Sequence, residues 1–150
     1  MKNGEDMQAR LSRAWNEVIG EDQRRRIHDL WNRIEAKTEL SDDDKRLADI
    51  LLDHEEYYAF WKGKKPDGAA IGLDPYLHVS LHLAVENQIV EQDPRQVMRY
   101  MLRRTGENIP RHEVMHEIVS VFSEYLLDAL RYQRQFNRGE YSQRLYDMGH

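Results

Sequence analysis

Two pairs of histidines with the same spacing are the residues of this sequence best suited to chemistry. His78 and His82 form the first pair, and His112 and His116 form the second. Residues four apart on a helix lie about 5 to 6 Å from each other on one face, so both imidazoles of a pair could bind one metal ion. The pattern therefore indicates a metal site.

The second pair also reads His-Glu-x-x-His, a pattern typical of zinc hydrolases, in which Glu113 would activate the zinc-bound water. The longer form of this motif requires a third histidine six residues further on, where this chain has Phe122. Glu140 is a candidate third ligand, but it falls in a predicted turn. A small zinc hydrolase is therefore one alternative, and the sequence does not decide whether the chain is an enzyme.

Helices must position these residues, because apolar residues recur at helical spacing along most of the chain and period-two runs are missing. N-cap residues or prolines mark several helix starts, at Ser41, Asp74-Pro75, Asp93-Pro94 and Ile109-Pro110. We predict an all-α, single-domain helical bundle over residues 1–150, with five to seven helices and a four-helix core. Residues 140–150 are expected to form a C-terminal cap or tail.

The apolar stripe from Leu47 to Trp61 includes His54, so we expect this histidine to face inward. Both histidine pairs are likewise expected to face the core. A buried imidazole without a partner costs about 1 to 3 kcal/mol, so inward histidines need a metal or hydrogen-bonded carboxylates. The predicted ligands of one or two Fe, Zn or Mn ions are His54, His78, His82, His116, Glu86 and His112. The main alternative is a non-enzymatic interaction module with a buried His and Glu hydrogen-bond network.

Composition restricts the partners and the cellular location. The chain has no cysteine and a net charge of −5, which excludes thiolate metal sites and argues against nucleic acid as a partner. It lacks the long apolar run of a membrane helix, and we expect a cytoplasmic protein. Trp15 and Trp31 are candidates for the contact face of a homodimer. No protein partner can be named from the sequence.

Four segments together resemble the bacterial domain-of-unknown-function family 1841. They are Leu40-Ser41, Leu51–Tyr57, Asp74–Gln88 and His116 with Glu124, and the resemblance covers residues 40–132 approximately. It implies a small all-helical bacterial protein with no assigned activity. The polar positions that it marks are His54, Glu56, Tyr57, His78, His82, Glu86, His116 and Glu124. We expect Glu56, Tyr57 and Glu124 to hydrogen-bond to the metal ligands, and residues 1–38 to form an N-terminal helix extension.

Overall fold

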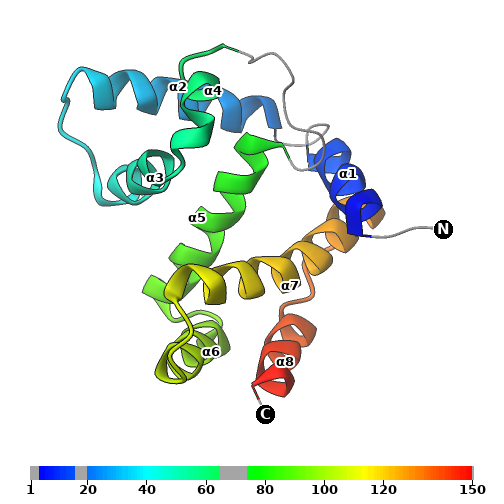
Figure 1. Cartoon of the computed structure of the whole chain (residues 1–150). Helices are drawn as coiled ribbons and strands as arrows, with labels where there is room; N and C mark the ends of the chain where they lie inside the picture. Colours follow the sequence, from blue (N-terminus) through cyan, green and yellow to red (C-terminus); the bar gives the residue numbers. More distant parts are fainter. Residues whose placement is uncertain (1–3, 16–19, 65–73, 150) are drawn as a thin grey trace. The chain divides into compact units, whose positions relative to one another are not determined.

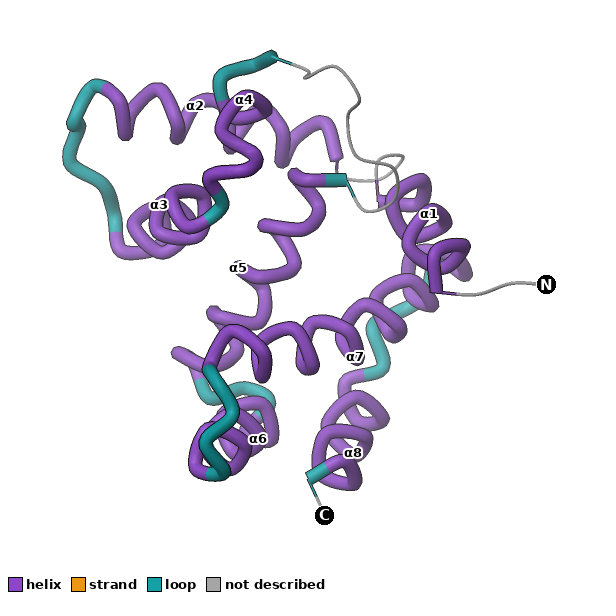
Figure 2. Tube along the Cα trace, viewed as in Figure 1, coloured by secondary structure: helices purple, strands orange, loops and turns teal. Residues whose placement is uncertain are grey.

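The structure is a computed structural model that describes residues 4–15, 20–64 and 74–149. These residues form helices and connecting turns, and no strand occurs among them (Figures 1 and 2). The helices are α1 (Gly4–Trp15), α2 (Glu21–Glu35), α3 (Asp42–Asp53), α4 (Tyr58–Trp61), α5 (Pro75–Glu91), α6 (Arg95–Gly106), α7 (Arg111–Tyr132) and α8 (Arg138–Met148). The predicted all-α class is confirmed. The glycine- and proline-containing segment from Gly63 to Asp74, which the sequence predicts to be a loop, lies mostly outside the described residues.

The described chain has eight α-helices, so the predicted number of five to seven was too low. The difference arises where we expected one continuous helix between residues 42 and 61. Helix α3 ends at Asp53, and a short 3-10 turn (Glu55–Tyr57) separates it from α4. Apolar residues keep helical spacing across this break, and hydrophobic periodicity therefore could not reveal it.

The chain divides into two compact units, residues 1–83 and residues 84–150. In the first unit, α2, α3 and α4 contact one another around the buried side chains of Ile27, Leu30, Leu51 and Trp61. In the second unit, α6, α7 and α8 contact one another. Each unit thus contains three mutually contacting helices, and the predicted four-helix core stays a prediction.

Side chains that accept hydrogen bonds from the first turn define two helix starts as predicted. Asp74 Oδ1 accepts from the backbone N–H of Tyr76 at 2.8 Å, and Pro75 is the first residue of α5. Ser41 Oγ accepts from the N–H of Asp44 at 3.2 Å at the start of α3. These local contacts fix the beginning of α5, which carries His78 and His82, and of α3, which His54 follows directly.

Two expectations about the surface can also be compared with the structure. Trp15 and Trp31 are 1% and 4% exposed, so these proposed dimer contacts are buried side chains of the chain itself.

The C-terminal helix α8 buries Tyr141 and Leu145 and therefore packs as a cap. None of the described helices has the length and apolar character needed to cross a membrane.

Candidate metal centre

Helix α5 places His78 and His82 one turn apart on a largely buried helix. Its apolar residues cover more than one side, and the buried ones include Leu77, Val79, Leu81, Leu83 and Val85. A helix that is apolar nearly all round is surrounded by other elements rather than lying at the surface. His82 is consequently only 8% exposed, and His78 is half-buried.

The third histidine, His54, comes from the break at the end of α3. One ligand nitrogen from each of His54, His78 and His82 can be chosen so that all three lie within 4.8 Å of one another. The ring centroid of His54 is 5.1 Å from that of His78 and 5.3 Å from that of His82. The centroids of His78 and His82 are 4.6 Å apart. Across the described parts of the chain, this is the one group of three or more His, Asp or Glu side chains with such geometry.

The backbone of the α3 end also fixes which nitrogen of His54 can bind a metal. The Nδ1 atom of His54 lies 2.7 Å from the carbonyl oxygen of Ile50. A carbonyl oxygen only accepts hydrogen bonds, so Nδ1 carries the proton and a neutral ring presents the Nε2 lone pair. A ligating histidine is commonly oriented by such a hydrogen bond from its other nitrogen to a backbone carbonyl.

The spacing of the three rings fits a shared metal ion. With metal–nitrogen distances of about 2.0 to 2.1 Å, three imidazoles at tetrahedral angles have ring centroids about 5 Å apart. The observed centroid distances of 4.6, 5.1 and 5.3 Å match this spacing. The three nitrogens would then be about 3.3 Å apart, which small side-chain rotations can reach. Three neutral nitrogen donors leave one position open for water or another ligand.

The aromatic ring of Tyr57 packs beside the histidine cluster. Its ring is parallel to that of His54, with a 3° interplanar angle and a centroid distance of 5.8 Å. It also meets the ring of His78 edge-on at 5.9 Å. Burial, together with the charge of Glu56, raises the pKa of Tyr57, so its phenol stays protonated at neutral pH. Tyr57 is one of the residues expected near the ligands, and its ring lies beside those of His54 and His78.

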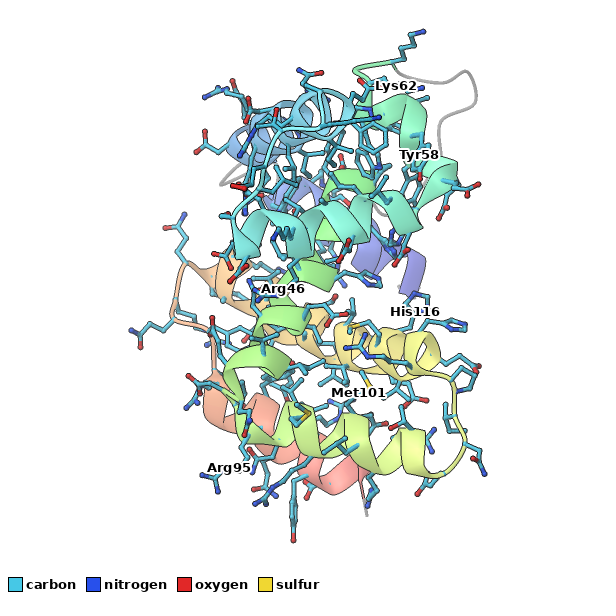
Figure 3. The ribbon with its side chains drawn as sticks, turned by 90° about the vertical axis from the view of Figure 1, so that its left-hand side faces the viewer. Arg46, Tyr58, Lys62, Arg95, Met101 and His116 are labelled. Atoms are coloured by element: carbon cyan, nitrogen blue, oxygen red, sulfur yellow. The ribbon has the colours of Figure 1, made fainter. Side chains whose placement is uncertain are left out.

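The second histidine pair does not face the core, and that expectation was wrong. His112 and His116 are exposed on α7, and their ring centroids are 6.5 Å apart (Figure 3). The buried side of α7 is formed instead by Val114, Met115, Ile118 and Val119. Both histidines belong to the second unit, whereas His54, His78 and His82 belong to the first.

The carboxylates predicted near the metal have other surroundings. Glu86 accepts two hydrogen bonds from the guanidinium of Arg111, at 2.8 and 2.9 Å. Glu124 lies 3.4 Å from Arg144, and Glu56 is exposed. The Glu86–Arg111 pair gives Glu86 a structural role within the second unit, and such a partner 25 residues away cannot be read from local spacing.

His28 is not among the predicted site residues, and the composition and spacing of the sequence indicate only a surface position for it. In the structure, His28 forms hydrogen bonds instead. Its Nε2 lies 2.7 Å from the Tyr76 hydroxyl and 3.2 Å from the Phe60 carbonyl oxygen. Tyr76 lies in the first turn of α5, so these contacts join α2 and α4 to the helix that carries two of the histidines. The signal in the sequence was the position of His28 next to buried Ile27 and three residues before buried Trp31.

The fold and the site define an all-helical protein with a three-histidine cluster that could hold a metal ion. The chain belongs to the family described as Domain of unknown function (DUF1841), whose model matches residues 20–147. The match is wider than the segment recognised from its motifs, and it includes residues 20–38, which we had assigned to an N-terminal extension. No curated protein and no solved structure matches this chain.

Proposed function

We propose that this protein binds one divalent transition-metal ion through His54, His78 and His82. The observation that carries the proposal is the convergence of three imidazoles, from two separate helical segments, at the spacing of a shared ion. Helical spacing alone explains why His78 and His82 are close. It does not explain why the end of α3 brings a third imidazole, already oriented by Ile50, to the same point.

Zinc is the metal that suits this set of ligands best. The cluster has three imidazole nitrogens and no carboxylate, whereas iron and manganese sites usually include carboxylate oxygens. Three protein ligands with an open fourth position are also typical of zinc sites that bind water or substrate. Such an ion would act as a Lewis acid toward a ligand in the fourth position.

Titration of the metal-free, untagged protein with zinc, with a chelator of known affinity as competitor, tests the proposal. We expect one zinc per chain, and replacement of His54, His78 or His82 by alanine should weaken the affinity by at least about 100-fold. The affinity should also fall on acidification, because protons compete with the metal for imidazole nitrogen.

His112→Ala is the matched control, because it removes an exposed imidazole from a pair with the same helical spacing. Its zinc affinity should equal that of the unaltered protein. Equal losses in the His82→Ala and His112→Ala proteins would contradict the assignment. Absence of zinc binding, together with a melting temperature that falls on acidification, would instead favour a metal-free histidine network.

A further inference from the structure

A pocket of about 300 Å³ is formed by α6 and α8 in the second unit, two helices that lie side by side (Figure 1). Helix α6 contributes Gln96, Arg99, Tyr100 and Arg103. Helix α8 and the residue that follows it contribute Leu145, Tyr146 and Gly149. The volume is at the lower end of the range of small-molecule sites, and the lining combines cationic with aromatic groups.

The two arginines of the pocket carry positive charge that no carboxylate balances. Arg99 and Arg103 are one helical turn apart, and neither pairs with an acidic side chain in the part of the chain that the structure describes. Arg95, which is labelled in Figure 3, lies one further turn toward the start of α6. Their neighbour Arg104 differs, because it binds Glu117 at 2.9 Å and Glu107 at 2.7 Å. Like charges at this spacing destabilise a helix, so a bound anion would relieve their repulsion.

The floor of the pocket is apolar and aromatic. The Tyr100 hydroxyl is already engaged, since it donates to Glu117 Oε1 at 2.7 Å, and Tyr100 therefore contributes its ring. Leu145 is 1% exposed, whereas the Tyr146 side chain is 48% exposed at the edge of the site. An exposed tyrosine ring beside a guanidinium offers a surface on which a planar ring can stack.

Gly149 allows the guanidinium of Arg103 to lie close to the end of α8. A Cβ atom at position 149 would be 2.7 Å from Arg103 Nη2 and 3.0 Å from Arg103 Cζ, which is closer than non-bonded atoms approach. Any side chain at this position would therefore move the guanidinium. The backbone of Gly149 has an ordinary φ of −78°, so alanine can adopt this conformation, although its Cβ would also lie 3.3 Å from the carbonyl oxygen of Tyr146.

We propose that this pocket binds a nucleoside monophosphate. The phosphate dianion would lie between the guanidinium groups of Arg99 and Arg103, and the base would stack on Tyr146. Each guanidinium can donate two parallel N–H hydrogen bonds to a pair of oxygens. The three terminal oxygens of a phosphate monoester can accept from both guanidinium groups at once, whereas the two oxygens of a carboxylate are occupied by one. The remaining volume and the aromatic lining suit a planar heterocycle. The chain is acidic as a whole, with a net charge of −5, which disfavours a nucleic-acid polymer on the same surface.

Binding of adenosine monophosphate to the full chain, measured by calorimetry in the presence of chelator, tests this proposal independently of the metal site. We expect saturable binding with Kd below about 1 mM, and at least about tenfold weaker binding of adenosine and of inorganic phosphate. Amide NMR shifts on titration should be largest around Gln96, Arg99 and Tyr146. Raising the salt concentration should weaken the binding.

Three variants and one control locate the site. Arg99→Gln and Arg103→Gln should each weaken adenosine monophosphate binding by about tenfold or more. Gly149→Ala should weaken it by about threefold without any change in charge, because it displaces the Arg103 guanidinium. Arg131→Gln is the control, since Arg131 is an exposed arginine of α7 outside the pocket, and its affinity should stay within about twofold.

Several results would overturn the proposal. They are the absence of saturable binding, equal affinity for adenosine and its monophosphate, or unchanged affinity in both pocket arginine variants. Tighter binding of an oligonucleotide without a terminal phosphate would also overturn it and would identify the arginines of α6 as a nucleic-acid surface. NMR shifts confined to residues outside α6 and α8 would exclude the pocket even if a variant failed to fold.

Discussion

His54 shows how much depends on a single side chain in this protein. Its backbone N–H donates to Leu51 O at 3.2 Å, and its ring donates to Ile50 O at 2.7 Å. Ile50 O would receive a backbone N–H if α3 continued regularly, so the imidazole replaces that helical hydrogen bond. The same contact lies at the end of the helix and leaves Nε2 as the nitrogen that can bind a metal.

Glu117 provides a prediction at the level of a residue. Its hydrogen bond with Arg104 holds the pKa of Glu117 below its ordinary value of 4.5, although burial opposes this shift. A lowered folded-state pKa means that the carboxylate stabilises the fold above about pH 4.5 and that this stabilisation disappears as the pH falls through the folded-state pKa. Glu117→Gln should therefore be less stable than the unaltered protein at pH 7, and this difference should shrink as the pH falls through the folded-state pKa of Glu117.

Denaturant unfolding of both proteins across this pH range measures the difference. Glu91→Gln, at an exposed position of α5, controls for the loss of one negative charge and should follow the unaltered protein throughout. A stability difference between Glu117→Gln and the unaltered protein that did not change with pH would show that the Arg104 contact is not its source.

At the level of the helices, local capping chemistry explains where α3 and α5 begin. Asp74 and Ser41 each accept hydrogen bonds from the first turn, and both positions were predicted from the sequence. The start of α8 was predicted less well. Asn137 caps it by accepting from the N–H of Glu140 at 3.1 Å, so α8 begins at Arg138, before the first apolar residue, Tyr141. Apolar spacing cannot detect a first turn that consists of polar residues.

Ser41→Ala should destabilise the protein by about 1 kcal/mol, because the N–H of Asp44 loses its side-chain acceptor. For a chain of this size the loss corresponds to a fall in melting temperature of about 2 to 4 °C. Ser41→Asn is the matched control, since asparagine caps helices as well as serine does, and it should melt within about 1 °C of the unaltered protein. Equal melting of the alanine and asparagine variants would show that the cap contributes little to stability.

The sequence predicted part of the candidate site for reasons that the structure makes clear. His78 and His82 follow from helical spacing, and His54 follows from its place in an apolar stripe. The same stripe concealed the break at His54. For His112 and His116, a position at the edge of an apolar stripe could mean either burial or exposure, and packing in the second unit left them exposed. The pairing of Glu86 with Arg111 depends on tertiary structure and had no local signal.

At the level of the whole molecule, each of the two units has its own polar feature. Residues 1–83 contain the three converging histidines, and residues 84–150 contain the arginine pocket. The family match spans residues 20–147 and thus includes most of both units. Each site is built from side chains of a single unit, so the two proposals can be tested separately.

Elemental analysis of the untagged protein, purified without chelator and compared with its His82→Ala variant, tests the central claim most directly. The proposed site predicts about one zinc ion per chain in the unaltered protein and less than about 0.2 in the variant. Less than about 0.2 metal ions per unaltered chain, with equal thermal stability of the two proteins, would contradict it.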